Sequence, residues 1–185
     1  MKTKTTKKGD ESTPENIEVD ANVADNIQEN GITEEAIPDK EKATDVDSHF
    51  KTLLVGLAPK LSSKSKGLIG YEVALNIDDK CRYLRLTSND SGGLFSKEWV
   101  ELDDLYELLE AMEADKPFKS SVFKSIMKGG SANNVSFLSA VLRSEEVALI
   151  LKSEKSQFLH VVNPLLINQR DRLSKLKPLR TSSKA

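Results

Sequence analysis

Cationic and aromatic side chains gather in one part of this chain, around a short segment with a two-residue period. In residues 81–88, Leu84 and Leu86 fall on one side of an extended chain, and Tyr83 and Arg85 fall on the other. Phosphate groups attract mobile cations, and nucleic-acid bases stack on flat side chains. The pattern therefore predicts a nucleic-acid-binding surface. Its candidate contact residues are Lys64, Lys66, Lys80, Arg82, Tyr83, Arg85 and Lys97.

Other residue types that support chemistry are too few or wrongly spaced for a reactive site. The two histidines, His49 and His160, and the single Cys81 do not form a zinc-site spacing. Gly92-Gly93 and Gly129-Gly130 resemble turns and not phosphate-binding loops. We therefore expect no catalytic residue, no metal and no cofactor. Cys81 is interpreted as a small buried or edge residue at the start of a strand.

Charge is divided unevenly along the chain. Residues 1–48 contain six Lys and thirteen Asp or Glu, a net charge of −7, whereas residues 49–185 contain 21 Lys or Arg and 16 Asp or Glu, a net charge of +5. The acidic part has almost no long apolar or aromatic content, so we predict that residues 1–48 form a disordered tail. Residues 1–8 do not resemble a secretory signal, and no window is apolar enough to span a membrane. With a single cysteine, these features favour a cytoplasmic protein.

The first half of the remaining chain predicts a helix, three strands and a second helix. Phe50, Leu53, Leu54 and Leu57 recur at helical spacing after Ser48 and before Pro59. Period-two alternation then predicts strands at 68–77 and 81–88, followed by a short strand at Leu94-Phe95. Ser96 is expected to cap a helix over 97–113, in which Trp99 anchors an apolar stripe.

The second half predicts the same order of elements. A helix is expected from Pro117 to Gly129. Strands are expected near 135–143, 146–152 and 157–162, before a last helix that Asn163-Pro164 opens and Pro178 ends.

A weak internal repeat supports this parallel. When 71–112 is laid on 136–177, six of the 42 pairs are identical, and the apolar positions agree more widely. The fold class predicted is α+β, a tandem repeat of an antiparallel sheet plus a helix, forming a pseudo-dimer in one chain. Units at 49–113 and 117–177 would form a single domain over 49–180, behind the acidic tail. The alternative is a chance match between two strand-rich windows.

The outward faces of the two units differ. The first is polar, but the second carries Phe137, Val141 and Ile150, and an apolar outer face needs a cover. The cover could be the edge of the first sheet, the leading helix or another chain. The surface around Phe137 and Val141 is therefore a candidate site for a protein partner or for homo-oligomerisation.

The segment Leu94-Phe95-Ser96-Lys97-Glu98-Trp99-Val100-Glu101-Leu102 resembles a part of the Whirly and transcriptional-coactivator group of single-strand DNA-binding proteins. It is similar to the last strand, the capped helix start and the Trp-containing helix of that group. The acidic tail is similar in kind to the coactivator's. The resemblance implies four strands per unit, so the stretch before Leu68 would have to supply one. It also implies backbone-driven binding of single-stranded or melted DNA, with Lys64-Ser65-Lys66-Gly67 as a loose analogue of the Whirly lysine-glycine-lysine signature.

These observations predict a non-enzymatic protein that binds nucleic acid, single-stranded DNA in particular. It would be an accessory to transcription or to DNA processing such as replication, repair or conjugal transfer. One alternative is an adaptor subunit that joins a larger protein complex. Another is that the scattered lysines and arginines only keep a small domain soluble.

Overall fold

The computed structural model describes residues 45–131 and 133–179, and these form a mixed α+β fold with two antiparallel sheets. Of the predicted acidic tail, residues 1–44 lie outside the described residues. Residues 45–48 belong to η1 (Asp45–His49), a short 3₁₀ helix that leads into the first strand.

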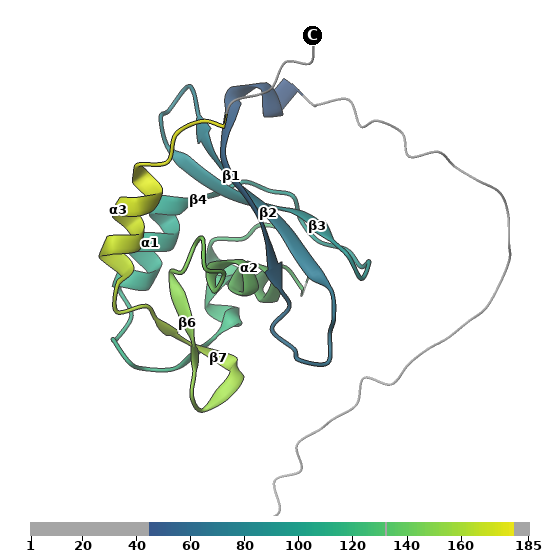
Figure 1. The fold of residues 1–185 in the computed structure, drawn as a ribbon, viewed down its shortest axis with the longest axis vertical. Helices are drawn as coiled ribbons and strands as arrows, with labels where there is room; N and C mark the ends of the chain where they lie inside the picture. Colours follow the sequence, from purple (N-terminus) through teal and green to yellow (C-terminus); the bar gives the residue numbers. More distant parts are fainter. Residues whose placement is uncertain (1–44, 132, 180–185) are drawn as a thin grey trace, which may run out of the picture. The chain divides into compact units, whose positions relative to one another are not determined.

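The first sheet contains four strands in sequential order (Figure 1). These are β1 (Phe50–Pro59), β2 (Leu68–Asn76), β3 (Arg82–Asn89) and β4 (Val100–Glu101). The strands predicted at 68–77 and 81–88 are confirmed as β2 and β3. In β3, Leu84 and Leu86 face the core, as the alternation predicts, while Tyr83 and Arg85 lie on the outer face.

The helix predicted around Phe50–Leu57 is wrong, because this segment is the edge strand β1. Its pairing with β2 shifts between Thr52 and Leu54, as a β-bulge does. The extra residue interrupts the two-residue period of the strand. The apolar residues on either side of Leu53 and Leu54 therefore recur at a spacing that resembles that of a helix. The stretch before Leu68 thus supplies a fourth strand to this sheet.

Helix α1 (Leu102–Glu110) begins five residues later than the predicted helix over 97–113. Val100 still pairs with Leu84 in the sheet, so the helix starts only after β4. The strand predicted at Leu94-Phe95 is absent from the described residues. Gly92 and Gly93 adopt φ values of 72° and 90°, and Leu94 beyond them is 85% exposed. Ser96 accepts a hydrogen bond from the Glu98 amide within this loop and does not cap the helix.

The second half contains a smaller sheet in the order β5-β7-β6. The strand predicted at 157–162 is confirmed as β7, and the last predicted helix is confirmed as α3. The helix predicted from Pro117 is instead a two-residue strand followed by a 3₁₀ helix. The elements are β5 (Phe118–Lys119), η2 (Ser120–Ser125), α2 (Asn134–Leu142), β6 (Ile150–Ser153), β7 (Ser156–Val162) and α3 (Leu166–Ser174).

The strand predicted at 135–143 is wrong, because this segment is helix α2. Seven of its nine residues are buried, on all sides of the helix, so it shows no apolar stripe with a helical period. The 65-residue register therefore places strand β2 opposite helix α2. The tandem repeat is not confirmed, although α1 and α3 do fall in register.

The two halves share one hydrophobic core, and α2 packs on the inner face of β1 and β2. The backbone of β1 lies close to a side chain of β2, because a Cβ at Gly56 would overlap the ring of Tyr71. Helices α1 and α3 lie side by side at one flank (Figure 1), where Arg170 pairs with Glu110 at 2.9 Å. The chain then returns to the first strand, and the Leu179 amide donates to the Thr52 carbonyl at 2.8 Å.

Candidate nucleic-acid interface

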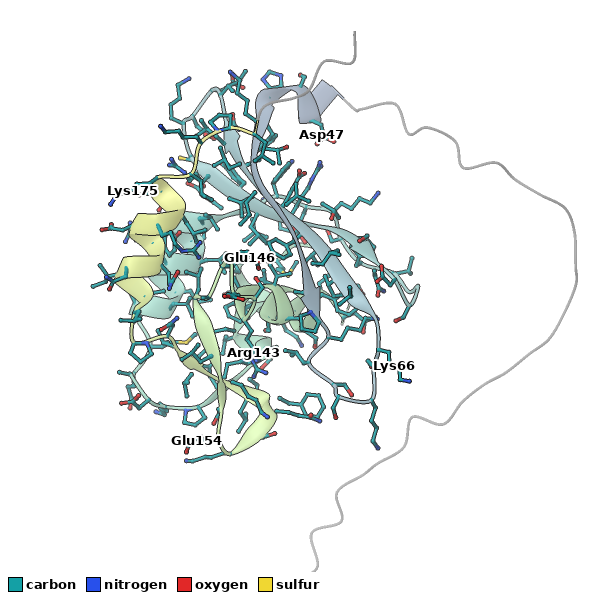
Figure 2. The ribbon with its side chains drawn as sticks, in the orientation of Figure 1. Asp47, Lys66, Arg143, Glu146, Glu154 and Lys175 are labelled. Carbon is teal, nitrogen blue, oxygen red and sulfur yellow. The ribbon has the colours of Figure 1, made fainter. Side chains whose placement is uncertain are left out.

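The predicted contact residues do not form one surface. Tyr83 and Arg85 lie on the outer face of the first sheet, and Lys80 and Arg82 lie at its β2–β3 end. Lys64 and Lys66 lie in the β1–β2 loop at the opposite end, and Lys97 lies in the segment between β3 and β4. Figure 2 shows Lys66 at the far end of the sheet from Asp47.

Arg85 sits in a cluster of rings and acids on the outer face of the sheet. Its guanidinium lies 4.2 Å from the ring of Trp99, which stacks on Phe50 at 4.1 Å. Its Nε pairs with Glu72, which is buried, and one terminal nitrogen lies 2.7 Å from Asp47. The geometry gives Arg85 a structural role, because two carboxylates neutralise the cation and the ring covers one side of it. Trp99 anchors this cluster outside the helix where it was predicted.

Tyr83 is engaged in the same way. Its hydroxyl donates to Asp79 at 2.8 Å and lies 3.4 Å from Glu101. Burial, followed by the hydrogen bond to Asp79, raises the pKa of the Tyr83 hydroxyl. Its ring contacts Phe50 edge-on at 5.4 Å. Two acids beside this ring repel an incoming phosphate backbone, so the outer face of the sheet is poorly suited to stacking a nucleic-acid strand.

Lys80 and Arg82 line a cavity of about 230 Å³ together with Arg170. Each of the three cations already has a protein partner: Lys80 the Ile77 carbonyl, Arg82 the Ser174 carbonyl, and Arg170 the carboxylates of Asp103 and Glu110. The lining thus contains three cations and one acid, Asp103, and each cation is already bonded to a protein group.

Cys81 lies at the edge of that cavity, just before β3, and is half-buried. Its sulfur and carboxylate oxygens of Glu101 and Asp103 lie within 4.8 Å of one another, so these three groups could ligate one ion. A hydrogen bond with Glu101, then burial and the nearby acids, raise the pKa of the thiol to about 11. The thiol is therefore protonated at neutral pH, and Lys80, Arg82 and Arg170 line the same cavity. These features do not support a metal site.

Lys64 and Lys66 are exposed in a loop with internal order. The Ser65 amide donates to the Ser62 carbonyl at 3.0 Å, and the Lys60 amide donates to the Gly67 carbonyl at 3.4 Å. The loop thus presents two lysine side chains from a shaped backbone, which lowers the ordering cost of binding an anion.

Leu61 of this loop also lines the larger of the two cavities described here, about 490 Å³, within the usual range for ligand pockets. Phe158 on the same wall is 52% exposed. Figure 2 shows the loop and the β6–β7 hairpin at the same end of the molecule, marked by Lys66 and Glu154. The cavity combines hydroxyl groups, one lysine and apolar side chains. Its walls are Leu61, Lys119, Ser120, Ser121, Val135, Ser136, Ser156, Phe158 and Leu159.

Ser120, in one wall of this cavity, contacts a buried histidine. Ser120 Oγ lies 2.8 Å from Nε2 of His160, which is fully buried. Burial, with a smaller contribution from the nearby Arg143 cation, lowers the pKa of His160 to about 4. Sequence reasoning missed this site. Ser120 and His160 are 40 residues apart and meet only because β5 pairs with β7, which places Phe118 opposite His160.

The apolar sheet face predicted around Phe137 and Val141 as a partner surface is wrong. Val141 and Ile150 are fully buried, and Phe137 is partly buried with the Lys60 ammonium 5.3 Å from its ring centre. Because α2 is a helix with its apolar residues in the core, it leaves no apolar sheet face to cover. Exposed apolar side chains occur instead on β1, where Val55 and Leu57 are 60% and 58% exposed.

The chain matches no protein-family model, no curated protein and no solved structure. In the part of the chain that the structure describes, no helix is long and apolar enough to cross a membrane.

Proposed function

We propose that this protein binds single-stranded nucleic acid, single-stranded DNA in particular, without catalysing a reaction. The interface proposed is the end of the molecule formed by the β1–β2 loop and the cavity beside the β6–β7 hairpin. The observation that carries the proposal is the exposed Phe158 ring on the wall of a cavity that also presents Lys119 and serine hydroxyls. An aromatic platform beside cations is the usual arrangement for binding single strands.

The charge and placement of Lys64 and Lys66 support this location. Both are exposed, and both belong to the loop that contributes Leu61 to the cavity. The acid-paired Arg85 and Tyr83 carry less weight in the proposal than these two lysines. A role in transcription or in DNA processing agrees with this activity, and it remains part of the proposal.

The test is a salt series of fluorescence anisotropy titrations with a labelled oligothymidine and with a duplex of equal length. Phe158→Ala should weaken oligothymidine binding by about 1–3 kcal/mol, the effect of one lost stacking contact. Lys64→Ala with Lys66→Ala should flatten the dependence of log K on log salt by up to about 0.7 per lost phosphate contact. Lys175→Ala, at the far flank in Figure 2, is the matched control and should leave the slope unchanged. Equal, salt-independent results for all variants would contradict the proposal.

A second candidate function is a protein-interaction adaptor, favoured by the exposed Val55 and Leu57. They are two residues apart on β1, so they share one face of an edge strand. Val55→Ser with Leu57→Ser should then abolish partner binding or self-association measured by light scattering, and it should leave oligonucleotide binding unchanged.

A further inference from the structure

The contact between Ser120 and His160 has the geometry of a nucleophile and its general base. Ser120 lines the 490 Å³ cavity, and its Oγ lies 2.8 Å from Nε2 of His160. In a hydrolase, this histidine would remove the serine proton and become an imidazolium. The surroundings of His160 decide whether it can do so here.

Those surroundings oppose an imidazolium. The Arg143 cation beside the ring disfavours a second positive charge, and burial removes the water that would stabilise it. Among the described residues, Nδ1 of His160 has no hydrogen-bond partner, so no carboxylate is there to orient or stabilise a charged ring. Ser120 is therefore not activated as a nucleophile.

The same facts indicate which nitrogen of the neutral ring carries the proton. A buried N–H without a partner is rarer and costlier than a buried acceptor without one, and a neighbouring cation also favours a bare lone pair over an N–H. We therefore assign the proton to Nε2, which then donates to Ser120 Oγ. The hydroxyl proton of Ser120 is left free to donate into the cavity.

Three further serines line the cavity, Ser121, Ser136 and Ser156, together with Lys119. Several donors beside one cation suit a group with several acceptor oxygens, as a phosphate has. The exposed Phe158 ring and the apolar Leu61 and Val135 side chains suit a flat, weakly polar body.

We propose that this cavity binds one nucleotide unit, with its phosphate accepting a hydrogen bond from Ser120 beside Lys119 and its base against Phe158. The nucleotide is either part of a bound single strand or a free mononucleotide. No bond is made or broken, and His160 is a positioning residue that fixes the direction of the Ser120 hydroxyl. The inference rests on the proposed function and names the subsite within it.

The experiment is calorimetric titration of the full chain with thymidine monophosphate, thymidine, inorganic phosphate and oligothymidine. Thymidine monophosphate should bind, and thymidine and phosphate alone should each bind at least about tenfold more weakly, because each lacks one of the two contacts. Ser120→Val should weaken binding of thymidine monophosphate and of oligothymidine about tenfold, the effect of one hydrogen bond to a charged group. Ser125→Ala, which removes an exposed hydroxyl from the same 3₁₀ helix, is the matched control.

Each other outcome overturns a part of the argument. If Ser120→Val and the smaller Ser120→Ala both keep full affinity while the Lys64 and Lys66 variants lose it, the subsite is wrong and the proposed function stands. If oligothymidine does not bind the wild-type chain, the proposed function fails, and if thymidine monophosphate does not bind either, the subsite fails with it. Phosphate binding as strongly as thymidine monophosphate would remove the base contact. Covalent labelling of Ser120 by a fluorophosphonate probe would show an activated serine and contradict the proton assignment.

Discussion

Replacing Arg85 with alanine tests whether this cation supports the fold or binds nucleic acid. In the folded protein it pairs with Glu72 and Asp47 and lies on the ring of Trp99. Its removal leaves the Glu72 carboxylate, whose side chain is 11% exposed, with only the Thr52 hydroxyl as a described partner. A buried charge left without its partner costs about 3–5 kcal/mol.

Three adjustments set the expected size of the effect. The Thr52 hydrogen bond and the 21% exposure of Arg85 lower the cost of the unpaired Glu72. The pair with Asp47, 32% exposed, contributes only about 0.2–1 kcal/mol, and the contact with Trp99 contributes about 0.5–2 kcal/mol. Since such contributions do not add fully, we expect Arg85→Ala to lower the free energy of unfolding by about 3 kcal/mol.

Urea unfolding followed by far-UV circular dichroism measures this loss. Circular dichroism is preferred to fluorescence, because the emission of Trp99, the single tryptophan, changes when Arg85 is removed. Lys116→Ala is the control, since its pair with Glu113 is exposed on both sides and is worth at most about 0.5 kcal/mol. Glu72→Gln in the Arg85→Ala background should recover part of the loss. A loss below about 1 kcal/mol, together with weaker oligonucleotide binding by the folded variant, would refute the structural role.

Three further outcomes are expected. The unfolded chain binds a proton at His160 near pH 6.5, and the folded chain does so only near pH 4, so stability should fall by about 3 kcal/mol as the pH is lowered from the first value to the second. His160→Gln should flatten this dependence in urea titrations. Gly56→Ala should lower the free energy of unfolding by about 1–3 kcal/mol, because its methyl group overlaps the ring of Tyr71. Deleting residues 1–44, which contain eleven acids and six lysines, should strengthen oligothymidine binding at low salt and have little effect at high salt; unchanged affinity at every salt concentration would contradict competition by the acidic segment.

The sequence allowed correct prediction where one face of an element is buried and the other is not. β3 is such an element, since Leu84 and Leu86 face the core while Tyr83 and Arg85 do not. Strand β1 was predicted as a helix because its bulge at Thr52–Leu54 adds a residue to the two-residue period. Helix α2 was predicted as a strand because a helix buried on all sides shows no apolar period of 3.6 residues. The start of α1 was misplaced because Val100 pairs with Leu84, a long-range contact without a local signal.

For the candidate site, residue types could be predicted but their partners could not. The two-residue period places Tyr83 and Arg85 on the outer face of a strand, and that placement is confirmed. Their neutralisation by Asp79, Glu72 and Asp47 depends on which strands and turns become neighbours. The cavity at Ser120 and Phe158 depends in the same way on the pairing of β5 with β7.

The bond from the Leu179 amide to the Thr52 carbonyl has a consequence for the order of events during synthesis. Strands β1 to β4 are joined in sequence and pair with their neighbours, so their contacts are available while the ribosome is still translating the second half. The contacts of Thr52 with Leu179 and of Arg82 with the Ser174 carbonyl form only once residues 174–179 have emerged from the ribosome. Until then the edge of β1 at Thr52 is open to pairing with a neighbouring nascent chain. A segment made after the helices and strands of this fold therefore occupies the edge of β1 at Thr52.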